Sequence, residues 1–272
     1  MVISFGKYEG AGNDFILIDK RTIEFEPIPK MVAALCDRHF GIGADGMMLL
    51  SIGRGEAEFD MRYFNSDGHE ATMCGNGGRC ITLFAHHLGI GGRNKRFSSV
   101  DGLHRASLLR CDEIKGLVEL QMIDVVRFER FGDEFLIDTG SPHYIVFVDS
   151  VDSIDVVKEG RRIRQESRWK SMGGVNVNFV EINGEGRFRL RTYERGVEDE
   201  TLACGTGATA SAIATHLYAQ HTTDRFDIAA RGGQLAVRFQ PQEESRFTEV
   251  WLKGPARKVF NGKFEVDNFI HL

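Results

Sequence analysis

The chain lacks the features of a membrane, exported or nucleic-acid-binding protein. No window approaches the roughly 18 apolar residues of a membrane helix. The N-terminal stretch MVISFGKYEG has no basic segment followed by an apolar one. We therefore expect no membrane span and no secretory signal. The formal net charge of −5 also disfavours a nucleic acid as the main partner.

Cysteine is scarce, and its spacing excludes common metal and redox motifs. The chain has 5 cysteines and no Cys-x-x-Cys pair. An odd, sparse set without an export signal predicts reduced thiols in a cytoplasmic protein. The residues are Cys36, Cys74, Cys80, Cys111 and Cys204.

The chain also lacks a recognisable nucleotide-binding loop. It has no Gly-x4-Gly-Lys-Ser/Thr sequence, and its match to Gly-x-Gly-x-x-Gly is GIGADG at 41–46. A helix-like segment precedes this match and a strand-like one follows it, which reverses the order of a dinucleotide-binding unit. These glycines are therefore predicted to form turns.

Glycine is abundant, with 31 residues, and two glycine clusters repeat. CGNG at 74–77 recurs as CGTG at 204–207, which defines a repeat offset along the chain. At the same offset FILID (15–19) lies over IVFVD (145–149), and MMLLSI (47–52) over VNFVEI (177–182). A repeat of this length indicates two homologous domains rather than a solenoid.

Both halves predict the same order of elements, with many strands and few helices, which favours an α+β fold over a doubly wound sheet. The expected helices are 28–38, 76–88, 154–168 and 206–220. The expected strands are 3–8, 14–19, 47–52, 59–64, 96–100, 103–110 and 117–122 in the first half, and 133–137, 143–149, 176–182, 187–194, 226–230, 234–239 and 247–252 in the second.

The domain boundaries are less regular than the repeat. VFNGKFEVDNFI at the C-terminus mirrors RFERFGDEFLID, the stretch that bridges the halves. The last strand is therefore expected to cross back to the first domain. We expect residues 1–118 plus 261–272 in the N-terminal domain and 119–260 in the C-terminal one.

Cys74 and Cys204 are each expected at or just before a helix N-terminus. Unpaired N–H groups and the positive end of the helix dipole stabilise a thiolate there and can hold a carboxylate. Glycines beside the sulfur let a ligand approach the backbone closely. A carboxylate substrate held by two such helix ends would face two thiols.

Other interpretations of the cysteines remain open at this point. Cys36, Cys80 and Cys111 are expected to be small buried hydrophobes. A zinc site from Cys74, Cys80, His86 and His87 is possible in sequence, but the spacing is unusual and several ligands would have to project from one helix toward one point.

Several stretches together resemble the diaminopimelate epimerase family. They are GAGNDFILID, FGIGADG, FNSDGHEATMCGNGGRC, GSPH, GVNVNF and TYERGVEDETLACGTGATA, in the family's order across nearly the whole chain. The resemblance implies two pseudo-symmetric domains, each a strongly curved, mostly antiparallel sheet around a central helix, with the active site in the cleft between them. It also implies a homodimer.

The resemblance implies a cofactor-independent isomerase that interconverts LL- and meso-2,6-diaminopimelate in lysine and peptidoglycan precursor biosynthesis. Inverting a stereocentre needs a base on one face and an acid on the other, which a thiolate and a thiol supply. Cys74 and Cys204 would be this catalytic pair, with no metal and no cofactor. His143 and Glu194 would tune the thiol pKa values.

The implied substrate contacts follow from the same motifs. Arg195 would pair with the distal carboxylate, and the asparagine amides and Glu194 would bind the ammonium groups. The set is Asn13, Asn65, Gly75, Asn76, Asn176, Glu194, Arg195, Gly205 and Thr206.

The chain departs from the family at two places. Ser141 stands where the family commonly has asparagine, which puts a substrate contact there in doubt. Gly46 replaces a residue that carries a side-chain amide in some members. Asn13 and Asn65 could instead be turn residues, Arg195 a surface ion pair, and His143 a structural histidine.

Three rival functions are carried forward. One is another two-cysteine isomerase of the proline racemase or hydroxyproline epimerase kind. The second is a cysteine hydrolase using Cys74 or Cys204 with His143, which gives the other cysteine no role. The third is a non-catalytic protein that binds amino acids.

Overall fold

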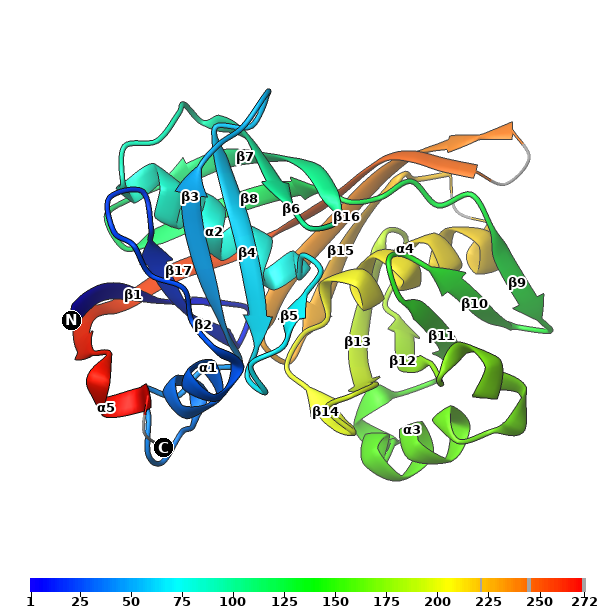
Figure 1. Cartoon of the computed structure of the whole chain (residues 1–272). Coiled ribbons are helices and arrows are strands. Elements are labelled where there is room, and N and C mark those ends of the chain that lie inside the picture. Colours follow the sequence, from blue (N-terminus) through cyan, green and yellow to red (C-terminus); the bar gives the residue numbers. More distant parts are fainter. Residues whose placement is uncertain (221, 244–245, 271–272) are drawn as a thin grey trace. The chain divides into compact units, whose positions relative to one another are not determined.

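The computed structural model describes residues 1–220, 222–243 and 246–270, and the chain divides into two compact units. Unit 1 contains residues 1–120 and the chain from Gly254 on, and unit 2 contains Gln121–Lys253. In Figure 1 the blue first part and the red last part of the chain both belong to unit 1. The sequence had suggested a return to the first domain at residue 261, whereas the chain re-enters unit 1 at Gly254.

Unit 1 contains two longer helices, one short C-terminal helix and nine strands, the last of which it shares with unit 2. The elements are β1 (Val2–Gly10), β2 (Asn13–Asp19), α1 (Pro29–Cys36), β3 (Gly46–Ile52), β4 (Phe59–Asn65), β5 (Glu70–Ala71), α2 (Gly75–His87), β6 (Asn94–Ser99), β7 (Gly102–Cys111), β8 (Lys115–Gln121), β17 (Arg246–Glu265) and α5 (Asp267–Ile270).

Most strands of unit 1 pair in a closed ring. β17 pairs with β1, and pairing continues through β2, β3, β4, β6, β7 and β8, which pairs with β17 again. The β2–β3 and β4–β6 pairs are parallel and the others antiparallel. Closure of the ring reduces the length of unpaired strand edge, although β4 and β6 pair over only two residues each.

Helix α2 contacts strands on several sides of this ring, among them β1, β2, β3 and β7 (Figure 1). Every residue from Gly75 to Ala85 is buried. Its glycines and alanine let the strands pack closely around it, while Asn76, Arg79 and Thr82 are polar residues buried on the same helix. Within the described residues no helix is long and apolar enough to cross a membrane.

Unit 2 has the same kinds of element in nearly the same order. They are β9 (Phe128–Phe131), β10 (Glu134–Asp138), β11 (Pro142–Phe147), a 3-10 turn η1 (Val151–Ser153), α3 (Val156–Arg164), a 3-10 helix η2 (Ser167–Met172), β12 (Asn176–Ile182), β13 (Arg187–Glu194), β14 (Asp199–Thr201), α4 (Gly205–Ala219), β15 (Arg225–Ala230), β16 (Gly233–Gln242) and the first part of β17.

The strands of unit 2 repeat the pairing of unit 1. The order runs β9, β10, β11, β12, β13, β15, β16 and β17, with parallel β11–β12 and β13–β15 pairs. Helix α4 contacts six of them, β10, β11, β12, β13, β15 and β16. Its run of glycine, alanine, serine and threonine lets the strands approach closely on all sides.

The predicted α+β fold of two homologous domains is confirmed. Helices α2 and α4 begin at Gly75 and Gly205, and strands β3 and β12 begin at Gly46 and Asn176, so both pairs are separated by the offset of the sequence repeat. The interpretation of GIGADG as turns is also confirmed, since α1 precedes it, β3 follows it, and Gly43 has a φ of 78°.

Strand β17 is longer than the sequence indicates. We expected a strand at 247–252, but β17 continues through Pro255 to Glu265. Its first residues pair with β16, and those from Gly254 on pair with β8 and β1. Proline lacks the backbone N–H that a strand interior uses, yet Pro255 is paired with Leu117 of β8 and the strand continues through it.

Candidate active site

Both predicted catalytic cysteines occupy the position directly before a helix. Cys74 has φ −91° and ψ 133° and precedes α2, and Cys204 has φ −119° and ψ 115° and precedes α4. In each case the cysteine carbonyl accepts the first helical hydrogen bond, from Gly78 at 2.7 Å and from Ala208 at 2.9 Å. The first N–H groups of each helix are thus left to bind an anion beside the sulfur.

In unit 1, strand topology brings the other predicted residues to the same end as Cys74. Parallel strands β2 and β3 begin there, at Asn13 and Gly46, and antiparallel β4 ends there, at Asn65. Gly46 pairs with Asn65 across β3 and β4. Asn65 is exposed, and its amide has no hydrogen bond to the rest of this group in the described structure.

The amides of Asn13 and Asn76 are held in one orientation by a chain of hydrogen bonds. Arg79 Nη2 donates to Asn76 Oδ1 at 2.7 Å, Asn76 Nδ2 donates to Asn13 Oδ1, and Asn13 Nδ2 donates to Asp45 Oδ2 at 2.9 Å. An arginine only donates and a carboxylate only accepts. Arg79 and Asp45, at the two ends of this series of hydrogen bonds, therefore fix the orientation of both amides. Each asparagine turns its oxygen toward Arg79 and its nitrogen toward Asp45.

The third residue after each cysteine is a glycine in close contact with the strand behind it. A Cβ on Gly77 would lie 2.1 Å from the Met48 methyl group, and one on Gly207 would lie 2.5 Å from Asn178 Oδ1. Met48 on β3 and Asn178 on β12 are themselves equivalent positions of the repeat. The same strand position therefore packs against the same helix turn in both units.

Unit 2 gathers its predicted residues in the same way. Parallel strands β11 and β12 begin at Pro142 and Asn176, β13 ends at Glu194, and α4 begins at Gly205. His143 pairs in register with Asn176. The end of unit 2 that carries Cys204 thus also carries His143, Asn176, Glu194 and Arg195.

A continuous set of hydrogen bonds joins Cys204 to a buried histidine. Cys204 Sγ lies 3.3 Å from Thr206 Oγ1, and Thr206 Oγ1 lies 2.9 Å from His143 Nε2. Ser141 Oγ lies 3.0 Å from the same nitrogen. His143 is 0% exposed, so these contacts lie in a site shielded from water.

Asn178 decides which ring nitrogen of His143 carries the proton. Its Nδ2 lies 3.1 Å from His143 Nδ1 and donates to the Tyr144 carbonyl at 3.3 Å, while its Oδ1 accepts from Thr192 Oγ1 at 3.0 Å. A carbonyl can only accept, so the amide nitrogen faces Nδ1. Nδ1 is then the acceptor, and the proton sits on Nε2, toward Thr206.

His143 is neutral in this environment. Burial away from water, together with the positive charge of Arg195, lowers its pKa to about 3. A neutral ring with the proton on Nε2 can donate to Thr206 Oγ1, whose own hydroxyl hydrogen is then available to Cys204. His143 therefore supports Cys204 as a hydrogen-bond donor through Thr206, not as a base.

Ser141 and Asn176 connect the histidine to Arg195. Asn176 Nδ2 donates to Ser141 Oγ at 3.3 Å and to the Pro142 carbonyl at 3.2 Å, and its Oδ1 accepts the Arg195 N–H at 2.9 Å. Ser141, which replaces the family's asparagine, thus binds His143 and Asn176. Asn176 is buried and holds the backbone of Arg195 in place.

The Arg195 side chain is anchored on one edge. Its Nη1 donates to the Met172 carbonyl at 2.9 Å and to the Gly174 carbonyl at 3.2 Å. Both Nη1 protons are thereby used. In the part of the chain that the structure describes, Nε and Nη2 make no hydrogen bond, and these two donors form the side-on edge that binds a carboxylate with two parallel bonds.

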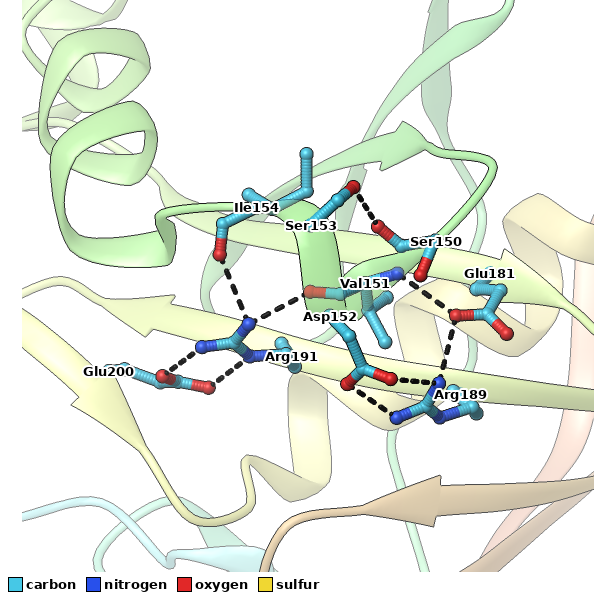
Figure 2. Close-up of polar contacts among 9 residues, drawn as sticks. All are labelled: Ser150, Val151, Asp152, Ser153, Ile154, Glu181, Arg189, Arg191 and Glu200. Carbon is cyan, nitrogen blue, oxygen red and sulfur yellow. Dashed lines mark hydrogen bonds and ion pairs between the residues drawn. The ribbon is translucent and has the colours of Figure 1, made fainter.

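A buried ion pair fixes the segment that leads into Cys204 (Figure 2). Arg191 Nε and Nη2 each donate to Glu200 at 2.7 Å, and Arg191 Nη1 donates to the carbonyls of Val151 at 2.8 Å and Ile154 at 3.1 Å. The Glu200 side chain is 8% exposed. This pair ties β14 to β13 and η1 four residues before Cys204.

The remaining cysteines lie elsewhere. Cys36 and Cys80 are buried, as expected of small hydrophobes, whereas Cys111 is only partly buried and lies 3.3 Å from His86 Nε2. His87 Nδ1 lies 2.7 Å from the Tyr8 hydroxyl. These contacts direct His86 and His87 away from Cys80, and no cluster of three or more metal-ligating side chains occurs among the described residues.

Three buried polar residues of these networks are absent from the sequence predictions. Asn178 and Thr192 are buried on neighbouring strands, and Arg79 is buried on α2. The sequence did contain a signal for two of these residues, Asn178 and Arg79. Asn176 and Asn178 alternate on one face of an apolar strand, and Arg79 is a cation inside a segment of small residues, where buried charges are rare.

Comparison with known proteins identifies relatives of the whole chain. The sequence model described as diaminopimelate epimerase matches residues 5–113 and 135–259. A protein from Flavobacterium psychrophilum named diaminopimelate epimerase is 45% identical over 258 residues, which cover 93% of this chain and 97% of that protein. Another from Chlorobaculum tepidum, with the same name, is 40% identical and covers 93% of this chain and 98% of its own length.

Solved structures share the fold at low sequence identity. A Bacillus anthracis phenazine biosynthesis protein of the PhzF family has a TM-score of 0.75 and 13% identity, covering 97% of this chain and 99% of that one. A probable proline racemase from Agrobacterium radiobacter has a TM-score of 0.71 and 16% identity, covering 98% and 94%. At these identities the likeness concerns the fold alone.

Proposed function

The chain belongs to the diaminopimelate epimerase family, and on that premise we propose that it is an isomerase that interconverts LL- and meso-2,6-diaminopimelate without a cofactor. This reaction serves lysine and peptidoglycan precursor biosynthesis. One observation carries the residue assignment. Two cysteines, equivalent in a duplicated fold, each precede a buried helix with the next glycines in close contact with the strand behind them.

The proposed reaction moves one proton off and another onto the same carbon. A thiolate takes the proton from Cα on one face, and a thiol on the opposite face delivers its own proton, so Cys74 and Cys204 exchange roles with the configuration of the substrate. The hydrogen delivered to the product is therefore not the hydrogen removed from the substrate.

The carbanion-like state needs stabilisation at the α-carboxylate. Backbone N–H groups of Gly75, Asn76, Gly205 and Thr206, at two helix starts, would hold it. Fixed donors of this kind stabilise developing negative charge without reorganising, and the loss of one costs about 100- to 1,000-fold in rate. Helix dipoles add to the effect in a site closed to water.

His143 and Glu194 are the proposed modulators of the thiols. The buried neutral ring of His143 donates through Thr206 toward Cys204, which favours negative charge on that sulfur when it acts as base. Glu194 ends β13 at the same end of unit 2. A carboxylate near a thiol favours the protonated form, so Glu194 would oppose His143 in setting the balance.

The far end of the substrate would meet Arg195 and the asparagines. The side-on edge of Arg195 suits the distal carboxylate, while Asn13, Asn65 and Asn176 with Glu194 would bind the ammonium groups. Asn176 already binds the Arg195 backbone through Oδ1, and a substrate would use the second lone pair of that oxygen.

The test is deuterium exchange in heavy water. LL-diaminopimelate is incubated in D2O with the wild type and with Cys74→Ala and Cys204→Ala, and deuterium at Cα and epimer composition are followed. We expect exchange and epimerisation in the wild type and no net epimerisation in either variant. Full epimerisation by either alanine variant would sink the two-base proposal.

The rivals give different results in the same assay. Exchange with proline but not with diaminopimelate would favour a proline racemase-like enzyme, whose fold this chain shares. Hydrolysis of a thioester or amide without Cα exchange would favour a hydrolase, although His143 donates from Nε2 and is poorly suited to be its base. Binding without exchange would favour a non-catalytic protein.

We further propose that the protein is a cytoplasmic homodimer.

A further inference from the structure

Arg79 is a fully buried cation that none of the steps above uses. Its side chain is 0% exposed. Nη1 donates to the Gly75 carbonyl at 3.2 Å, Nη2 to Asn76 Oδ1 at 2.7 Å, and Nε to the Pro255 carbonyl at 3.2 Å. All three acceptors are neutral. A buried charge without an opposite charge costs several kcal/mol, so this arginine needs a counter-charge.

The guanidinium lies at the start of α2 because helical side chains lean toward the N-terminus. Its contacts with Gly75 and Asn76 place it beside the first turn, next to the residue that precedes the helix, Cys74. Burial lowers the pKa of Arg79, and negative charge on the neighbouring Cys80 or Cys74 sulfur would oppose this by favouring the protonated guanidinium. The attraction is mutual, and the full charge of Arg79 adds to the partial charge of the helix end.

The equivalent position in unit 2 is neutral. Thr209, which the repeat offset aligns with Arg79, donates from Oγ1 to the Gly205 carbonyl at 3.0 Å. This repeats the bond from Arg79 Nη1 to Gly75. The two helix starts therefore share this hydrogen bond, but α4 has a neutral hydroxyl where α2 has a guanidinium. Around Cys204 the hydrogen-bonded groups Thr206 and His143 are neutral, and the charged residues at that end of unit 2 are Glu194 and Arg195.

The other ionisable groups around the start of α2 are neutral or already paired. Burial raises the pKa values of the Cys80 thiol on α2 and the Tyr8 hydroxyl on β1, so both stay protonated. The carboxylates have their own partners. Glu9 on β1 accepts from Arg257 at 2.9 Å, Asp14 on β2 pairs with Lys7 and Arg38 at 2.8 Å, Asp45 pairs with Arg38 at 2.7 Å, and Asp101 contacts His104 at 3.1 Å.

We propose that Arg79 is the counter-charge of Cys74, and that Cys74, not Cys204, is the thiolate in the substrate-free enzyme. The inference rests on the proposed two-cysteine function, because it says which thiol begins as the base. The isomer whose Cα–H faces Cys74 then reacts directly with the resting enzyme. Afterwards Cys74 holds the substrate's proton and Cys204 has lost its own, and exchange with solvent restores the resting form.

The test measures alkylation of each cysteine against pH, using neutral iodoacetamide and mass spectrometry of the labelled peptides from the intact protein. In the wild type the midpoint for Cys74 should lie below that for Cys204. Midpoints are compared rather than rates, since the two sulfurs differ in exposure. A lower midpoint for Cys204 in the wild type would overturn the proposal, and this comparison requires no variant to fold.

Three variants then separate the effect of the Arg79 charge from other influences on the Cys74 midpoint. Arg79→Gln keeps an amide donor and removes the charge, and should raise the Cys74 midpoint by about one pH unit or more, a tenfold loss of thiolate at a given pH. Arg79→Lys keeps the positive charge, so its Cys74 midpoint should stay within a few tenths of a pH unit of the wild-type value. Thr209→Val, the matched change on α4, should leave both midpoints where they are.

An unchanged Cys74 midpoint in an Arg79→Gln protein with wild-type circular dichroism would contradict the assignment. A merely structural role for Arg79 would lower thermal stability without moving this midpoint. Failure of the two-base function itself would appear separately, as epimerisation by an alanine variant in heavy water. The two results are therefore distinguishable.

Discussion

Replacing Thr206 with valine tests the hydrogen-bond relay to Cys204. The hydroxyl lies 3.3 Å from Cys204 Sγ and 2.9 Å from His143 Nε2. Valine keeps the shape and the backbone N–H but removes the donor. A hydrogen bond to a charged group contributes about 1.5–3 kcal/mol. At about 1.36 kcal/mol per factor of ten, kcat should fall by about 10- to 150-fold.

The assay separates this effect from substrate binding. Because the backbone N–H that would hold the α-carboxylate remains, KM should change by less than about threefold while kcat falls. Thr206→Ser, which keeps the hydroxyl, is the matched control and should stay within about threefold of the wild type. A Thr206→Val enzyme with wild-type kcat would refute the relay, and so would equal losses in the valine and serine variants.

Three more predictions follow from the described contacts. Arg195→Lys should raise KM for diaminopimelate by about 10- to 150-fold, because an ammonium cannot offer the side-on pair of donors, and an unchanged KM would argue against a carboxylate at that edge. His143 has a pKa lowered to about 3, so it should stay neutral with the proton on Nε2 from pH 8 to pH 5 in nitrogen NMR. The stability that this burial provides is present above about pH 6.5 and lost as the pH falls toward 3, and titration near pH 6.5 would contradict the buried network. Glu200→Ala should lower the free energy of unfolding by about 3 kcal/mol because it leaves two arginines without their buried partner, whereas Asp152→Ala, at a side chain that is 68% exposed, should have a much smaller effect in the same urea titration.

Local signals in the sequence were enough for the repeated fold. Glycine clusters mark turns, and apolar alternation marks strands, so both halves could be divided into matching elements and each cysteine placed before a helix. These local signals gave wrong element boundaries where tertiary packing overrides local preference. Pro255 argued against a continuous strand, yet β17 runs through it from unit 2 into unit 1. The helix expected at 154–168 is shorter, since Asp155 caps its start and it ends at Arg164.

The polar networks of the site could not be derived in the same way. Asn178 acts on His143 because β11 and β12 are parallel neighbours, a pairing between residues 35 positions apart that no local pattern encodes. Likewise, the Asn76 amide is oriented by Arg79 on one side and Asn13 on the other. The residue types could be predicted to matter, whereas the direction of each hydrogen bond required the structure.

The origin of the hydrogen on the first product molecules tests the central claim most directly. LL-diaminopimelate is given to the wild-type enzyme in D2O, and the reaction is stopped after a few per cent conversion. A thiol carries a single proton, so two opposed thiols predict deuterium at Cα in nearly all of the meso product and protium in the remaining LL substrate. Early meso product that retains the substrate's own protium would mean that one group serves both faces, and would contradict the assignment of Cys74 and Cys204 as an acid–base pair.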